Sequence, residues 1–348
     1  MENQPLVSIV INNFNYGQYL REAIESALNQ TYPNVEVIVV DDGSTDSSRD
    51  VIEEYALLGK VVPVYKENGG QASAFNAGFR VSRGQVVLFL DADDVLLPHA
   101  LARVVAAWRP GITKVQGRME VVDATLKPLG YTYPPKDIPL PSGSVRDLLL
   151  RWRMYPSPPT SGNAFSRDFL STVLPMPEEC WRISADSYLL TLAGLRGPIL
   201  SVEEPLALYR VHGKNAWATL SLVKERLERE IQIEECQKRL IWEEATQMGW
   251  NPRYPFGHAH GYKVEALAKA LGSGLVQTSY ARLALDGLVA SLTWPHLSWR
   301  KRLRQSVFFL LLLLLPHRLR ARWLIWGLDV VGRPFWLKRL VRWAGGGS

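Results

Sequence analysis

The chain has 348 residues, of which 47% are apolar, so it is long and apolar enough to bury a full core and to exceed one domain. The net charge of +6 is unevenly distributed, because residues 296–348 hold eleven Lys and Arg residues and one acid. That segment carries a net charge of +10 and the remainder −4, which excludes an overall basic character for the first part of the chain.

The N-terminal sequence lacks a basic region followed by an apolar run, so we expect no secretory signal. Cys180 and Cys236 are 56 positions apart and match no metal-binding spacing. We therefore expect two free thiols in a reducing compartment.

The first third of the chain alternates short apolar runs with segments of helical periodicity. We expect strands at residues 7–11, 35–40, 61–65, 86–90 and 114–122. The intervening helices are expected at 19–30, from a cap at Ser44 or Asp46 to about residue 55, at 72–81 and at 98–108. This alternation is typical of right-handed βαβ units, so the sequence predicts an α/β fold with a mainly parallel sheet flanked by helices.

The later segments are less regular. Residues 123–159 are rich in proline and are expected to form loops over the sheet. Helices are predicted at 166–173 and 183–195, a strand at 198–209, and further helices at 220–248, 263–271 and 279–292. We divide the chain into a first domain at 1–218, a helical extension at 219–295 and a basic tail at 296–348.

Three carboxylates follow the most apolar of the predicted strands. Residues 86–90 have no polar alternation, which indicates a strand buried on both faces, and Asp91, Asp93 and Asp94 come directly after it. These like charges repel unless a cation lies between them, and carboxylate oxygens suit Mg²⁺ or Mn²⁺. The alternative is an acidic turn before the next helix.

Polar side chains follow the other strands in the same way. Asn12 and Asn13 end the first strand, Asp41 and Asp42 the second, and Asn68 and Gly69 the third. Because the carboxyl ends of parallel strands meet at one edge of a sheet, all of these groups are expected at one edge, where α/β proteins bind ligands.

Five short motifs, in this order, resemble the inverting family-2 glycosyltransferases with a GT-A (Rossmann-like) nucleotide-sugar fold. They are residues 7–16 (VSIVINNFNY), 39–46 (VVDDGSTD), 68–72 (NGGQA), 91–94 (DADD) and 209–212 (YRVH). The resemblance covers about residues 6–215. It implies a transferase that moves a sugar, as hexosyltransferases do, from a nucleotide-diphosphate donor, with a UDP-sugar favoured.

The resemblance also implies site residues. Asn12, Phe14 and Asp42 would hold the nucleobase, with Asp41 nearby; Asn68 would lie near ribose or diphosphate, and Asp91 would contact ribose or metal. Asp93 would bind Mn²⁺ or Mg²⁺, and His212 would complete the metal shell. Turn, cap and structural roles are the alternatives for the aspartates and the histidine.

The reaction needs a base for the acceptor hydroxyl, and Asp186 matches the family's acid. Many relatives have Glu-Asp at this point, whereas this chain has Ala185 before the acid. Glu178 and Glu179 are alternates, and a helix cap is the structural alternative for Asp186.

The tail combines a leucine-rich run with basic and aromatic residues. Residues 306–315 are too few to span a bilayer, and five tryptophans (Trp299, Trp323, Trp326, Trp336 and Trp343) are interleaved with arginine. This composition favours peripheral association with a membrane surface over nucleic-acid binding. A buried core or oligomer helix is the alternative.

We therefore expect a metal-dependent enzyme of polysaccharide biosynthesis, cytoplasmic or on the inner face of the cell membrane. Its acceptor would be a cell-surface polysaccharide or a lipid-linked glycan. The alternative is a non-catalytic nucleotide-sugar-binding scaffold on the same fold. A nucleotidyltransferase is disfavoured because no glycine-rich, basic loop follows the first strand.

Overall fold

The chain divides into two units in the computed structural model, which describes residues 4–212, 224–253, 256–272, 274 and 276–328. Residues 1–146 and 156–213 form the first unit, and residues 147–155 and 214–348 form the second. Nothing in the sequence pattern predicts that residues 147–155 belong to the second unit. The division into a domain at 1–218, an extension and a tail stays a prediction.

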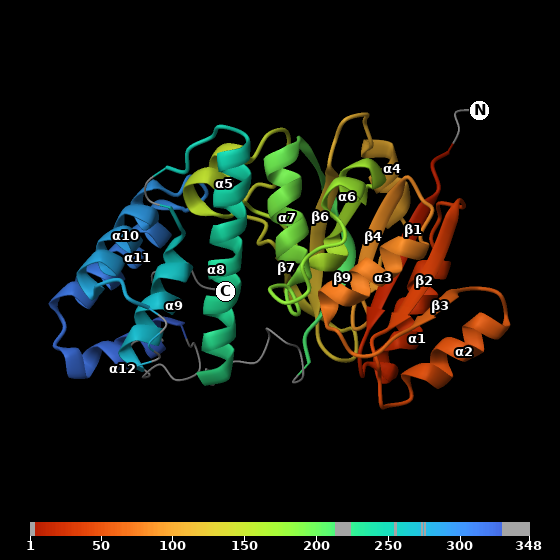
Figure 1. Cartoon of the computed structure of the whole chain (residues 1–348), viewed down its shortest axis with the longest axis horizontal. Coiled ribbons are helices and arrows are strands. Elements are labelled where there is room, and N and C mark those ends of the chain that lie inside the picture. The colour runs from red at the N-terminus through yellow and green to blue at the C-terminus, as the bar shows by residue number, and fades with distance from the viewer. Residues whose placement is uncertain (1–3, 213–223, 254–255, 273, 275, 329–348) are drawn as a thin grey trace. The chain divides into compact units, whose positions relative to one another are not determined.

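Four parallel strands form the half of the sheet that the βαβ pattern predicts. They are β1 (Val7–Asn13), β2 (Val35–Asp41), β3 (Val62–Tyr65) and β4 (Val86–Asp91), and they lie side by side in the order β3-β2-β1-β4 (Figure 1). The central strands β1 and β4 are almost entirely buried, which explains their unbroken apolar sequences. The α/β fold predicted from the sequence is confirmed.

Three of the connecting helices bury one face, as their periodicity predicts, whereas the helix after β3 buries the seven consecutive residues 72–78. The connecting helices are α1 (Gly17–Leu28), α2 (Ser48–Leu57), α3 (Gln71–Val81) and α4 (Ala100–Ala107). On α1, Leu20, Ala23, Ile24 and Ala27 recur at helical spacing and lie in the core with the apolar residues of β1 and β4.

The second half of the sheet is mixed, although parallel residue pairs predominate in the sheet as a whole, as predicted. It contains β5 (Val95–Leu96), β6 (Lys114–Val122), β8 (Asn163–Ser166) and β9 (Ile199–Arg210). Strand β8 inserts between β4 and β6 and is antiparallel to both, whereas β6 and β9 are parallel. Strand β8 has only four residues and no continuous apolar run, so it left no clear signal in the sequence.

Residues 123–159 contain regular elements, which corrects the expectation that they form loops. They contain β7 (Pro128–Tyr133), which pairs with β6, and α5 (Arg146–Trp152). Strand β7 points Leu129, Tyr131 and Tyr133 outward and buries Thr132. This alternation is the reverse of the usual pattern of an apolar face toward the core, so the strand was not recognisable from the sequence. The 3-10 helix η1 (Thr160–Gly162), α6 (Arg167–Val173) and α7 (Ala185–Arg196) complete the first unit.

The second unit is helical, as predicted for the extension. It contains α8 (Lys224–Gln247), α9 (Ala259–Ala270), α10 (Tyr280–Thr293), α11 (Trp299–Leu314) and α12 (His317–Leu328) (Figure 1). The leucine-rich run lies in α11, which buries Phe308, Phe309 and Leu312 in the core of this unit. Within the described part of the chain, every helix is too short or too polar to cross a bilayer.

A buried arginine fixes residues 147–155 to the helices of the second unit. The Nη2 atom of Arg153 lies 3.1 Å from Glu234 Oε2 of α8 and 3.9 Å from Glu265 Oε1 of α9. Burial alone would raise the pKa of Glu234, but the charges of His258 and Arg153 outweigh that effect and lower it. The buried guanidinium is therefore neutralised inside this unit.

The expectation of free thiols is wrong, because Cys180 and Cys236 are both disulfide-bonded. The spacing of cysteines along a sequence does not determine whether they form disulfides, so spacing alone could not have decided this.

Candidate active site

The polar groups predicted at one edge of the sheet do meet there. Strands β1, β2 and β4 are parallel and in register, with Asn13 beside Asp41 and Asn12 beside Asp91. The side chain of Asn12 donates to Asp91 Oδ1 at 2.9 Å, and that of Asn13 donates to Asp41 Oδ1 at 3.2 Å. This part of the sequence-based prediction is confirmed.

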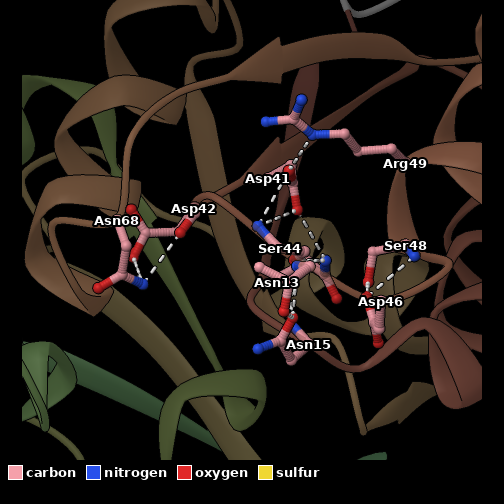
Figure 2. Close-up of polar contacts among 10 residues, drawn as sticks. Asn13, Asn15, Asp41, Asp42, Ser44, Asp46, Ser48, Arg49 and Asn68 are labelled. Atoms are coloured by element: carbon pink, nitrogen blue, oxygen red, sulfur yellow. Dashed lines mark hydrogen bonds and ion pairs between the residues drawn. The ribbon is translucent and has the colours of Figure 1, made fainter.

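Asp41 organises the turn after β2. Figure 2 shows its carboxylate between the side chains of Asn13 and Arg49 and the backbone of Ser44. The backbone N–H of Ser44 lies 3.3 Å from Asp41 Oδ2, and Arg49 Nε donates to the same oxygen at 3.1 Å. Asp41 is fully buried, so these donors stabilise its charge and hold the turn in one conformation.

Asp42 is bound to the loop that follows β3. Its Oδ1 accepts from Lys66 Nζ at 2.6 Å and from the N–H of Gly69 at 2.9 Å. Its Oδ2 accepts from the Gly70 N–H at 2.7 Å and from Asn68 Nδ2 at 3.1 Å (Figure 2). A carboxylate accepts about four hydrogen bonds. The acceptor capacity of Asp42 is therefore used within the protein, and its direct effect is to fix the Asn68–Gly70 loop.

Gly70 is the N-cap residue of α3 and has a φ of 87°, a conformation that favours glycine. A Cβ at this position would lie 2.5 Å from the carbonyl oxygen of Arg182. That carbonyl accepts from the N–H of Gln71 at 2.8 Å. The glycine that the motif contains is thus required by the close approach of the segment before α7.

Asp91 lies between Asn12 and Gln71. Its Oδ1 accepts from Asn12 at 2.9 Å and from Gln71 Nε2 at 3.1 Å. Burial and the neighbouring charge of Asp93 raise the pKa of Asp91 to about 7. Asn12 Oδ1 is buried and has no protein hydrogen-bond partner, so this corner of the site retains an acceptor for an added donor group.

Asp94, whose role the sequence did not indicate, is bound to two other elements. Its Oδ2 accepts from Ser161 Oγ of η1 at 2.7 Å, and its Oδ1 accepts from the N–H of Arg210 of β9 at 3.1 Å. The side chain is 1% exposed. Asp94 therefore connects the carboxyl end of β4 to η1 and β9.

Asp93 and His212, predicted as metal ligands, lie side by side. His212 Nε2 is 3.0 Å from Asp93 Oδ2, and the rings of Tyr16 and Tyr19 lie 5.5 and 4.7 Å from the imidazole. Within the described residues there is no group of three or more His, Cys, Asp or Glu side chains that could hold a metal. One carboxylate and one imidazole fit a divalent cation that takes its remaining ligands from phosphate and water.

The raised pKa values around Asp93 support that fit. Burial, Asp93 and Asp91 raise the pKa of Asp94 well above its usual range. The pKa of Tyr16 is raised by burial and by Asp93. These shifts show an excess of negative charge at the end of β4, which a cation would relieve.

Asp186, the predicted base, lies in the first turn of α7. Its Oδ1 accepts from the N–H of Ser187 at 2.9 Å, and the Thr160 N–H also hydrogen-bonds to its carboxylate. Burial raises the pKa of Asp186, while these donors and the charge of Lys114 oppose the shift. The alternates Glu178 and Glu179 are exposed, and Glu178 accepts from Asn76 of α3 at 3.1 Å.

Two contributions to the site were not predicted. Gln71 joins its two halves, because its Nε2 donates to Asp91 while its Oε1 accepts from the N–H of Ala185 at 2.9 Å. The η1 residues Thr160 and Ser161 contact Asp186 and Asp94. Gln71 belongs to a recognised motif, but no pattern in the sequence indicates that η1 returns to the sheet edge.

Known proteins share this sequence pattern. The profile of Glycosyl transferase family 2 matches residues 8–145. An uncharacterized glycosyltransferase of Nostoc sp. is 40% identical over 214 residues, 60% of this chain and 66% of that protein. A second, from Rickettsia prowazekii, is 46% identical over 97 residues, which are 28% of this chain and 30% of that protein.

Solved structures share the fold. TarS of S. aureus in complex with UDP-GlcNAc aligns with a TM-score of 0.55 at 17% identity, over 87% of this chain and 90% of that one. The mannosyltransferase PcManGT of Pyrobaculum calidifontis, in complex with GDP-Man and Mn²⁺, aligns with a TM-score of 0.51 at 18% identity, over 93% and 86% of the two chains. The chain therefore belongs to the family-2 glycosyltransferases and has their GT-A fold.

Proposed function

We propose that this protein transfers a sugar, with inversion, from a nucleotide-diphosphate donor to a glycan or lipid-linked acceptor. The observation that carries the proposal is that polar contacts connect the acids at the end of β4 with the acid at the start of α7. Asp91 is the last residue of β4, Asp93 follows it, and Asp186 lies in the first turn of α7. Gln71 contacts Asp91 on one side and the N-terminus of α7 on the other.

The nucleotide would lie over the ends of β1, β2 and β3. Phe14 is 44% exposed and offers a face for the base, next to the Asn13–Asp41 pair. Asp42 and Asn68 would shape the pocket through the loop that they fix. Asn12 and Asp91 would hold ribose hydroxyls, and the unpartnered Asn12 Oδ1 supports this role.

Asp93 and His212 would hold a divalent cation, Mn²⁺ or Mg²⁺. When bound, such an ion neutralises the charge that develops on the departing nucleoside diphosphate. The pairing of the two side chains and the shortage of positive charge at the end of β4 support this assignment.

Asp186 would act as the general base. As the acceptor oxygen forms its bond to the anomeric carbon, the bond from that carbon to the diphosphate oxygen breaks, and the carboxylate takes the hydroxyl proton. Attack from the face opposite the leaving group inverts the anomeric centre. The partial burial of Asp186 supports this role, because a raised pKa makes a carboxylate a stronger base.

The donor class is tested by calorimetric titration of UDP, dTDP and GDP, each with and without Mn²⁺, followed by transfer assays with the matching sugar nucleotides. We expect UDP to bind best and binding to strengthen with Mn²⁺. Nuclear magnetic resonance of the product is expected to show the anomeric configuration opposite to that of the donor. A product with retained configuration would contradict the inverting mechanism, and binding without transfer or donor hydrolysis would favour a scaffold.

We further propose that the second unit associates with the surface of the cytoplasmic membrane. One side of α11 exposes Trp299, Leu303, Val307, Leu310 and Leu314, which recur at helical spacing, and basic residues flank the start of the helix. An amphipathic helix of this kind binds at a headgroup interface. The predicted tail residues beyond 328 lie outside the described part of the chain.

Sedimentation with vesicles tests this surface. The full chain is expected to bind vesicles that contain anionic lipid more strongly than neutral ones, and Leu303→Asp with Leu310→Asp is expected to reduce binding at least about tenfold, because each change removes about 1.5–3 kcal/mol of apolar burial. The matched control changes two exposed leucines of the first unit, Leu57→Asp and Leu58→Asp. Equal loss in both double variants would contradict a specific role for α11.

A further inference from the structure

Lys114 is a buried cation in the middle of the first unit. It lies on β6 and is 0% exposed. Its ammonium donates to three neutral oxygens, Gln116 Oε1 at 2.8 Å, Ser157 Oγ at 2.9 Å and Asn163 Oδ1 at 2.6 Å. An ammonium group has three N–H donors, so these acceptors satisfy it, but burial of its charge remains unfavourable.

The acceptors of Lys114 hold the segment of residues 156–163. Asn163 Nδ2 donates to the carbonyl oxygens of Pro158 at 3.1 Å and Pro159 at 2.9 Å, and Gln116 Nε2 donates to that of Pro156 at 3.2 Å. Each amide thus turns its oxygen to Lys114 and its nitrogen to the backbone. Lys114 therefore fixes both amides and, through them, the path of the segment.

The same segment carries the donors that reach the acids of the site. The Thr160 N–H hydrogen-bonds to Asp186, and Ser161 Oγ donates to Asp94 and accepts from the N–H of Asp91 at 3.1 Å. The segment thus connects Lys114 with both groups of acids.

The charge of Lys114 also acts on Asp186 directly. The charge of Lys114 on β6 lowers the pKa of Asp186, and the charge of Asp186 in turn raises the pKa of Asp91 at the end of β4. Burial lowers the pKa of Lys114 well below its usual range, and Asp186 opposes that shift. An attraction of this kind favours the ionised carboxylate, which is the form that a general base requires.

We propose that Lys114 is a positioning residue for Asp186: it holds the 156–163 segment that donates to this carboxylate, and its positive charge favours the carboxylate form. This inference rests on the proposed function, in which Asp186 takes the proton of the acceptor hydroxyl.

The test compares two variants, one that removes the charge of Lys114 and one that offsets it. Lys114→Met keeps the length of the side chain without its charge, and Gln116→Glu keeps Lys114 but places an opposite charge beside it. In both, the acidic limb of the pH profile of kcat/KM is expected to move to higher pH by about one unit, since Asp186 ionises less readily. On the acidic limb, where the rate is proportional to the ionised fraction of the base, kcat/KM at a given pH is expected to fall about tenfold, while the Kd of the nucleotide changes less than about twofold.

Ser157→Ala is the matched control, because it removes one acceptor of Lys114 and no charge. It is expected to lower thermal stability and leave the acidic limb in place. If Lys114→Met does not fold, Gln116→Glu supplies the same measurement. If the folded charge variants bind the nucleotide as the wild type does and their acidic limb does not move, the role of Lys114 is overturned and the proposed function is not affected. Wild-type transfer by Asp186→Asn would instead overturn the assignment of the base and, with it, this inference.

Discussion

Replacing Asp186 by asparagine is expected to lower kcat for sugar transfer by about 10²–10⁴-fold, the range that a general base contributes, and to leave nucleotide binding unchanged. The amide has nearly the shape of the carboxylate, and its oxygen can still accept from the N–H of Ser187. It cannot take a proton from the acceptor hydroxyl. The measurement is steady-state transfer at saturating donor, with calorimetry of the nucleotide alongside.

Asp168→Asn provides the control for this change. Asp168 also lies in the first turn of a helix of the first unit, α6, but it is exposed. The same chemical change at this position is expected to leave kcat within about twofold of wild type, because surface substitutions rarely perturb a distant site. Full activity of the Asp186→Asn variant would mean that another acid is the general base, and Glu178 would be the first to examine.

The pH dependence of transfer follows from the environment of Asp186. Burial raises its pKa, so the base form is present above this raised pKa and is lost as the pH falls through it. The acidic limb of kcat/KM is therefore expected at a higher pH than the usual pKa of an aspartate. In the Asp186→Asn variant, the residual activity is expected to lack this limb.

The edge of the sheet was predictable because its determinants are local. Apolar runs specify β1, β2 and β4, and parallel strands place their carboxyl ends together without further information. The contacts of Asn12 with Asp91 and of Asn13 with Asp41 follow from this topology and the register of the strands. The family motifs pointed to the same residues.

The other side of the site depends on contacts that sequence spacing does not encode. The 156–163 segment is separated from Asp91 by about 70 residues, and its polar side chains have no periodicity. Lys114 reads as an ordinary polar residue at the start of a strand, although the structure buries it completely. Burial of a charge becomes visible only when the packing around it is known, so neither Lys114 nor η1 could be assigned beforehand.

Replacing Asp93 by asparagine is expected to remove the dependence of nucleotide binding on Mn²⁺ and to lower kcat/KM at least about 10²-fold, equivalent to about 2.7 kcal/mol. Asp93 and His212 are the two protein groups proposed to hold the ion, and an amide oxygen is a weaker ligand than a carboxylate. The measurement is titration of UDP with and without Mn²⁺ on the wild type and the variant.

The same substitution at the neighbouring Asp94 provides the comparison, because it is expected to change stability rather than the dependence on Mn²⁺. Asp94→Asn replaces an acceptor for Ser161 Oγ and the Arg210 N–H, so a loss of about 1–3 kcal/mol in stability is expected while binding stays dependent on Mn²⁺. Asp93→Asn removes a charge that raises the pKa values of Asp91 and Asp94, so its metal-free stability should equal or exceed that of the wild type. If Asp93→Asn destabilised the fold and kept its response to Mn²⁺, the metal would belong to another acid of the cluster.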